Sequence, residues 1–545
     1  MEKTSIKGTE YLFYGFYLLL TIAKGMGLYE GMRLFDVLVC AAFLFLLCKL
    51  VQESYTLRQL VLTVFMILLG VITWQVSGKM GALFNLALLT GLRGVDQKRL
   101  IRISAGVWGI IFLLQCFLTM SGIRTEQIFR IHRKFGMYIV RWSMGFTHPN
   151  VLHITYFILI VLLFYACKPQ KRNQLLLYSV LAMLVNLLLF CYSVSYTGVL
   201  IVTVYLLMNA SLQSKVCYRG TFSSWERVAV YLMPILCVLF SVGAPILLKG
   251  KAFDLANKLL STRLELSRQY ILGQGIHLFG NANMEIVDAS ITVDCSYVYM
   301  LVHYGLIYFI FFCVLLEAAV VYCWKRQKMD AVAILMVCAI SGVTEQYMAN
   351  TSFKNVAILF IAVMFYDNPV WRSREGEHAD GVVNYSLKLK LLKHVTARWT
   401  VGCGKVSEYT TSAIEWILNH FCDNKKKVLL VSFGVFIVGV SSYCSTVHMP
   451  SSVYASLWDC DRKEGKAGYE YIYDTDLLNN PEFDGWILSD RDAQGRLYEF
   501  EGLTVVTEYY RRAAGRGFAL VILVLWIESA VAVLNTRIGN KNGQQ

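Results

Sequence analysis

Apolar runs long enough to cross a membrane recur along most of this chain. Of its 545 residues, 56% are hydrophobic and only 16% are charged, whereas soluble proteins carry about 25% charged residues. A transmembrane helix needs about 20 apolar residues, and uninterrupted apolar runs do not suit the alternating strands of a membrane β-barrel. The sequence therefore predicts an all-α, polytopic transmembrane helical bundle.

The apolar runs predict about 12 to 14 spans. They lie near residues 10–23, 34–50, 59–75, 80–92, 103–120, 149–167, 175–191, 194–209, 229–248, 297–324, 331–347, 355–367, 428–445 and 517–534. A cleavable signal peptide is not expected, because the first run lacks a cleavage site and many spans follow it.

Basic residues set the predicted orientation. The net charge of +14 is concentrated in the short segments on one side, and lysine and arginine favour cytoplasmic loops. Both termini are therefore predicted to be cytoplasmic. The short outer loops hold few basic residues, namely Lys24, Arg33, Lys79 and Lys354.

Long segments between the spans divide the chain. Residues 1–370 are predicted to form the core, with long outer loops near 121–148 and 249–296. Residues 371–427 are basic and partly apolar, which favours a cytoplasmic amphipathic segment on the inner leaflet. Residues 428–545 are predicted to form one more transmembrane hairpin.

The first long outer loop is strongly basic. Arginine offers planar, bidentate donors to phosphate, so this loop favours a phosphate-bearing ligand. The alternative is a solvated amphipathic helix on the lipid headgroups. Its basic residues are Arg124, Arg130, Arg133, Lys134 and Arg141, against the single acid Glu126.

This loop enters the next span at His148-Pro149-Asn150. Proline suits the first turn of a helix, where its missing N–H costs nothing. His148 would then lie near the positive end of that helix, which favours a neutral imidazole. A purely structural capping role is the alternative.

The second long loop holds a predicted helix led by Arg263, with Ser261 or Thr262 as its N-cap. The period of a helix brings four polar side chains of this segment to one face. Their mixture of one guanidinium and three neutral hydrogen-bonding groups suits a sugar pyrophosphate. Arg268 lies about 140° from Arg263 around that helix. An ordinary surface helix is the alternative. The four residues are Arg263, Ser267, Tyr270 and Gln274.

Acidic and histidine side chains follow near the ends of spans. Asp294 is placed at the outer mouth of the bundle, where a carboxylate could orient a sugar hydroxyl or take its proton. His303 is expected about two turns deeper, and Glu345 near the outer end of another span. Polar residues at such depth are buried in the bundle or functional, so structural hydrogen bonding is the alternative for each.

Four segments together resemble the Wzy-type family of bacterial polysaccharide polymerases, which is related to the O-antigen ligases. Two departures stand out: Tyr196 follows Ser195 where many relatives carry arginine, and Cys295 replaces the usual asparagine. The absence of a histidine near Asp294 favours a polymerase over a ligase. The segments are Gly145-Phe-Thr-His-Pro-Asn150, Tyr192-Ser-Val-Ser-Tyr-Thr-Gly198, the helix from Arg263 that closes on Leu278-Phe-Gly280, and Asp294-Cys-Ser-Tyr297 with Gly305-Leu-Ile307.

The resemblance implies a GT-C-like enzyme on the outer face of the bacterial plasma membrane that polymerises polyprenyl-diphosphate-linked oligosaccharide repeat units. It implies no metal, no cofactor and no nucleic acid, and flippase and chain-length regulator proteins as partners. Arg263 is assigned to the diphosphate, with Arg141 or Arg133 as a second clamp, and Asp294 or His148 to the acceptor hydroxyl. Further substrate-binding candidates are Arg268, Tyr270, Gln274, Tyr297 and His303.

Two other functions stay open at the level of sequence. An O-antigen-ligase-like transferase would move finished glycan to a different acceptor. A flippase of lipid-linked oligosaccharide would carry charges deep in several spans, whereas charges here collect near the outer rim. The acidic, tyrosine-rich segment 446–516 is predicted to form a small outer domain that contacts sugars or a partner protein.

Overall fold

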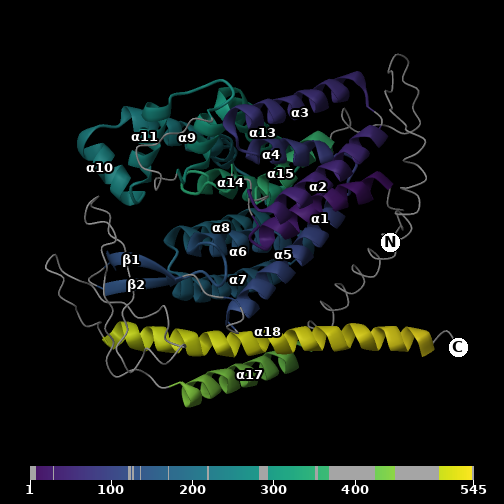
Figure 1. Ribbon diagram of the computed structural model, residues 1–545, viewed down its shortest axis with the longest axis vertical. Helices are drawn as coiled ribbons and strands as arrows, with labels where there is room; N and C mark the ends of the chain where they lie inside the picture. The colour runs from purple at the N-terminus through teal and green to yellow at the C-terminus, as the bar shows by residue number, and fades with distance from the viewer. Residues whose placement is uncertain are drawn as a thin grey trace. The chain divides into compact units, whose positions relative to one another are not determined.

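The computed structural model confirms the polytopic helical bundle (Figure 1). Ten helices within the described residues are long and apolar enough to cross a membrane, so the chain is a multi-pass membrane protein. The described residues are 8–28, 30–53, 55–120, 124, 128–134, 137–169, 171–217, 220–281, 293–349, 354–366, 424–447 and 502–542.

Helices make up nearly all of the regular structure. They are α1 (Gly8–Gly25), α2 (Arg33–Gln52), α3 (Leu57–Ser77), α4 (Gly81–Gly91), α5 (Gln97–Met120), α6 (Pro149–Cys167), α7 (Arg172–Ser193), α8 (Tyr196–Cys217), α9 (Ser224–Leu247), α10 (Gly250–Leu259), α11 (Arg263–Gln274), α12 (Ser296–Tyr299), a π-helical turn η1 (Met300–Tyr304), α13 (Gly305–Lys325), α14 (Met329–Ser341), α15 (Ala357–Tyr366), α17 (Lys425–Thr446) and α18 (Gly502–Asn542).

Four of the runs expected to cross the membrane are not among the ten long apolar helices. These are α1, α4, α14 and α15. Helices α4 and α14 have only 11 and 13 residues, and every residue of α4 is buried. Apolar runs of that length commonly form core helices rather than spans, and hydropathy alone does not separate a helix that faces lipid from one that faces protein.

The chain divides into two compact units. Unit 1 comprises Met1–Gly109, Ile154–Asn186 and Thr197–Ser407, and unit 2 comprises Ile110–His153, Leu187–Tyr196 and Glu408–Gln545. This division differs from the boundaries near 370 and 427 that the sequence suggests, because the first long loop belongs with the C-terminal helices.

Helix α9 is the support on which the later segments of unit 1 assemble. It begins with a capping box in which Ser223 and Glu226 bond each other's backbone N–H groups, and such a box satisfies amides that the first helical turn leaves unpaired. Helices α11, α12, α13 and α14 all contact α9. These are the elements that carry the predicted residues of the second long loop and its neighbours.

Unit 2 contains a β-hairpin where the sequence suggested a loop or an amphipathic helix. Strands β1 (Ile128–Lys134) and β2 (Met137–Trp142) are antiparallel, with Ile128 opposite Trp142 and an irregularity between Ile131 and Lys134. The helical alternative is therefore wrong. The segment is rich in isoleucine, valine and aromatic residues, which fit a pleated surface better than a helix.

The C-terminal helices of unit 2 pack along one another in the region expected to form the last hairpin (Figure 1). The contact is close at Gly439, where an added methyl group would lie 2.6 Å from the Cα atom of Gly517, and small residues allow such approach between membrane helices. Helix α18 begins within the segment 446–516 that was expected to be an outer domain. Residues 371–423 and 448–501 lie outside the described residues.

Candidate functional site

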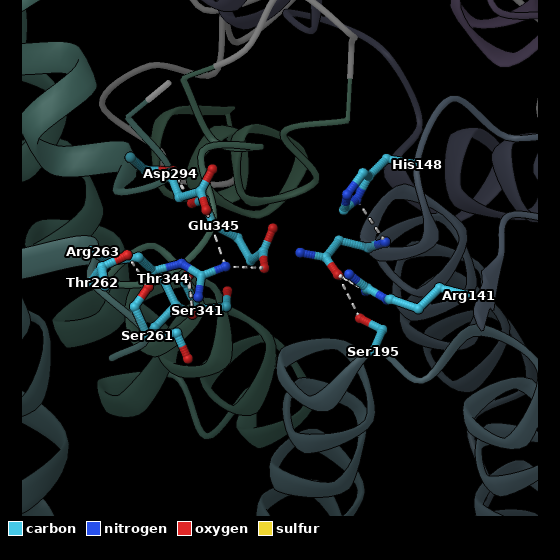
Figure 2. Close-up of polar contacts among 12 residues, drawn as sticks. Arg141, His148, Ser195, Ser261, Thr262, Arg263, Asp294, Ser341, Thr344 and Glu345 are labelled. Carbon is cyan, nitrogen blue, oxygen red and sulfur yellow. Dashed lines mark hydrogen bonds and ion pairs between the residues drawn. The ribbon is translucent and has the colours of Figure 1, made fainter. Parts of the chain in front are cut away.

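In unit 1, Arg263 lies between two carboxylates (Figure 2). Its Nη2 atom is 3.0 Å from Oδ2 of Asp294 and 3.6 Å from Oε1 of Glu345. The Arg263 side chain is only 13% exposed, and its Nε atom is buried without a hydrogen-bond partner among the described residues. One guanidinium nitrogen thus serves both carboxylates, while the buried Nε donor makes no hydrogen bond to the described residues.

A backbone elbow places Arg263 at the start of α11. Ser261 and Thr262 both adopt left-handed conformations, with φ of 53° and 67°, which are uncommon for residues with a side chain. The predicted hydroxyl cap is wrong, because Thr262 makes no side-chain cap. Instead, Oδ1 of Asn257 in α10 accepts a hydrogen bond from the backbone N–H of Glu265 at 3.0 Å.

The other residues of the predicted α11 face are less accessible than expected. Ser267 and Tyr270 are buried, and burial raises the pKa of the Tyr270 phenol, which therefore stays protonated. Gln274 is half-buried. The guanidinium of Arg268 lies 4.8 Å from the ring centre of Phe253, so the structure does not bring Arg268 to the Arg263 cluster.

Ser296 fixes the two carboxylates relative to Arg263. Its backbone N–H donates to the carbonyl of Gly342 at 2.8 Å, and its hydroxyl donates to the carbonyl of Glu345 at 2.6 Å. The segment that carries Asp294 is thereby bonded to the turn after α14 that carries Glu345. Two residues distant in the sequence consequently approach the same arginine.

Tyr297 has a structural position rather than the predicted substrate-binding one. Its side chain is fully buried, and its hydroxyl donates to the carbonyl of Ala339 at 2.8 Å. A buried hydroxyl needs such a partner, and this one joins α12 to α14. Tyr297 therefore reinforces the link made by Ser296.

The charge state of Asp294 is set by two opposing effects. Burial raises the pKa of the Asp294 carboxyl above its usual value, and the neighbouring Arg263 guanidinium opposes part of that rise. A carboxylate in a low-dielectric position is a stronger base than one in water. Asp294 is thus both positioned by an arginine and inclined to accept a proton.

The Leu-Phe-Gly and Gly-Leu-Ile segments form one structural unit. The backbone N–H groups of Leu306 and Ile307 donate to the carbonyls of His277 and Leu278, at 2.8 and 3.1 Å. These bonds satisfy amides at the start of α13 that have no partner within the helix. A methyl group on Gly280, whose φ is 93°, would lie 2.0 Å from the carbonyl oxygen of His303.

His303 lies in the π-helical turn that this packing encloses. It is 7% exposed, and its ring stacks on Tyr299 with centroids 4.0 Å apart. The ring of Tyr270 is 6.1 Å away, and Nδ1 of His303 is buried without a partner among the described residues. Single π-helical turns are frequent at functional sites, and the sequence pattern gave no sign of this one.

In unit 2, a second polar cluster joins two of the four segments quoted above (Figure 2). Asn150 accepts hydrogen bonds through Oδ1 from Nη2 of Arg141 at 2.7 Å and from the hydroxyl of Ser195 at 2.8 Å. Arg141 also donates through Nε to the carbonyl of Ser193 at 2.9 Å. Sequence reasoning missed Asn150 as the shared acceptor, although it belongs to the His-Pro-Asn segment.

The entry to α6 agrees with its sequence prediction. Helix α6 begins at Pro149, and Nδ1 of His148 accepts a hydrogen bond from the backbone N–H of Asn150 at 3.1 Å. That geometry is the structural capping role considered for His148. One turn further, Nε2 of His153 lies 2.7 Å from the Ser193 hydroxyl, a buried pair that the sequence analysis did not identify.

The side chain of Arg133 lies outside the described residues, and only its position in β1 is defined. Within the parts of the chain that the structure describes, no group of three or more histidine, cysteine or acidic residues is arranged to hold a metal ion. No known protein family, curated protein or solved structure matches this chain.

Proposed function

We propose that this protein joins polyprenyl-diphosphate-linked oligosaccharide repeat units into a cell-surface polysaccharide. The reaction takes place on the outer face of the bacterial plasma membrane, with both termini of the chain in the cytoplasm. The observation that carries this proposal is the Arg263 guanidinium, held between the carboxylates of Asp294 and Glu345.

The reaction exchanges one bond to the anomeric carbon for another. The bond from that carbon to the diphosphate oxygen of the donor breaks, and a bond to the acceptor hydroxyl oxygen forms. Negative charge grows on the departing polyprenyl diphosphate, and a preorganised guanidinium stabilises this change more than it stabilises the bound substrate. Arg263 supplies that guanidinium.

Asp294 takes the proton of the acceptor hydroxyl. Burial makes its carboxylate a stronger base, since the pKa of Asp294 is raised, and a base is most effective when its pKa approaches the working pH. Once protonated, Asp294 attracts Arg263 less. Glu345 then keeps the Arg263 guanidinium in place, and the positive charge of the guanidinium becomes available to the diphosphate.

The test is a deletion of the gene in the source cell, complemented with wild-type protein, Arg263→Ala or Asp294→Asn. We expect wild-type protein to restore a ladder of surface glycans, whereas both variants leave single repeat units at the surface. Loss of all surface repeat units would instead indicate a flippase. Accumulation of long glycan on the lipid carrier would indicate a ligase, and a normal ladder from both variants would remove the cluster from the mechanism.

A further inference from the structure

Helix α10 has one face committed to the interior of unit 1. Phe253 on this face is buried and packs with Ala244 of α9 and Leu264 of α11, and Ala256 and Leu260 pack against the same cluster. Residues three and four apart share a helix face, so this packing fixes the rotation of α10 about its axis. The opposite face must therefore point away from the protein.

The exposed side of α10 carries two large apolar side chains beside two lysines. Leu255 and Leu259, one turn apart, are 63% and 76% exposed. Lys251 and Lys258 are also exposed, and at about 100° per residue both lie on the same side of the leucine pair. An apolar stripe with lysines along its polar edge is typical of helices that lie in a membrane interface.

The lipid-facing surface of α9 leads directly into this stripe. Helix α9 is one of the ten apolar helices long enough to cross a membrane, and Leu236 and Leu239 are among its exposed side chains. Its last residue, Leu247, is 76% exposed, and only Leu248 and Lys249 separate it from α10. The apolar surface thus continues from a spanning helix onto α10 at the membrane boundary.

We infer that α10 lies in the membrane interface, with Leu255 and Leu259 inserted among the acyl chains and Lys251 and Lys258 on anionic phospholipid headgroups. The leaflet is the one at the C-terminal end of α9, which is the outer leaflet in the proposed topology. Lysine side chains reach headgroups from such a position because their apolar stems can lie along the lipid.

This arrangement defines the depth at which Arg263 works. The elbow at Ser261 and Thr262 joins α10 directly to α11, and Asn257 of α10 caps α11. Arg263 therefore begins the helix that directly follows α10, which rests on the headgroups. The interfacial position of α10 does not depend on the proposed reaction, and its test needs no substrate.

The test uses the full-length protein in nanodiscs, with an environment-sensitive fluorescent amino acid encoded at position 259. We expect blue-shifted emission that is quenched by phospholipids brominated near the top of their acyl chains and protected from aqueous iodide. The matched control carries the same residue at position 254, since Asp254 is exposed on α10 about 100° from Leu255. There, iodide should quench and the brominated lipid should not. Iodide quenching at 259 equal to that at 254 would overturn the inference.

A second measurement tests the lysines. With the label at 259, quenching by brominated phosphatidylglycerol is compared with quenching by brominated phosphatidylcholine. The Lys251→Gln/Lys258→Gln variant should lose preference for the anionic lipid by about fivefold for each lysine removed. A Lys325→Gln/Arg326→Gln variant removes two exposed charges at the far end of α13 and should keep the preference. An unchanged preference in the first variant would remove the headgroup contact.

Discussion

Arg263 combines a geometric role and a charge role that a lysine does not combine. Its Nη2 atom holds both carboxylates, while its Nε atom is buried and makes no hydrogen bond to the described residues. A lysine ammonium is a compact point charge without this planar arrangement of donors. We therefore expect even the substitution of Arg263 by lysine to lower activity.

We predict that Arg263→Lys lowers the rate of glycan polymerisation by about 10²-fold, the usual cost of losing one preorganised donor to a developing negative charge. The measurement is the rate at which long glycan forms, normalised to the amount of folded protein. Arg227→Lys, at an exposed position in α9, is the charge-matched control. Near wild-type rates for Arg263→Lys would show that only charge matters at this site.

The pH dependence of activity should reveal that Asp294 and Glu345 compete for Arg263. Removing the Glu345 charge lets Arg263 pair more fully with Asp294, and a nearby cation favours the ionised carboxylate. Glu345→Gln should thus lower the pKa of Asp294, which burial holds above its usual value.

Because Asp294 acts in its ionised form, activity should rise with pH through the pKa of Asp294. We expect Glu345→Gln to move this acidic limb of the pH–rate profile to lower pH. The profile of the single variant is compared with that of wild-type protein. An acidic limb that stays in place or moves to higher pH contradicts the assignment of Asp294 as the base.

At the scale of elements, two glycines hold the Leu-Phe-Gly turn against the start of α13. Both have positive φ, 93° at Gly280 and 86° at Gly305. We predict that Gly280→Ala destabilises the protein by more than the roughly 1–2 kcal/mol that a left-handed conformation costs, because its methyl group would also collide with the backbone of His303.

Gly273→Ala is the matched control for that substitution. Gly273 lies within α11 and has no atom within 4 Å of an added methyl group, so alanine should stabilise the helix by about 0.5–1 kcal/mol. Thermal unfolding of the two purified variants compares the positions. Equal melting temperatures for Gly280→Ala and Gly273→Ala would show that the turn is not tightly packed.

Local composition predicts some elements of this fold and not others. Hydropathy predicted most spanning helices, and the start of α6 at Pro149, because both depend on local composition. It did not predict the β-hairpin, because hydropathy does not report pairing between strands, and it did not predict the burial of α4, which depends on distant partners such as α15. At the site, Asp294 and Glu345 were identified singly, but their meeting at Arg263 depends on Ser296 and a turn 46 to 49 residues later.

At the scale of the whole molecule, the C-terminal helices belong to the same compact unit as the β-hairpin. Helix α18 contacts β2, and the Arg512 guanidinium lies 4.9 Å from the ring centre of Trp142. The last hairpin is therefore a structural part of unit 2 rather than an appended module.

We predict that ending the chain before residue 424 loosens β2 and leaves unit 1 folded. A cation–π contact alone contributes about 1 kcal/mol, so amide hydrogen exchange in β2 should accelerate by about fivefold or more. Amides of α13 and α14 serve as the internal control. Unchanged exchange in β2 would show that α18 does not support the hairpin.

Reconstitution with one substrate tests the proposed reaction most directly. The lipid-linked repeat unit is extracted from source cells that lack this gene and is supplied alone to purified full-length protein in lipid vesicles. We expect an electrophoretic ladder of glycans from wild-type protein and only the starting unit from Arg263→Ala. Intact repeat unit after incubation with folded wild-type protein, or the same ladder from Arg263→Ala, would contradict the proposal.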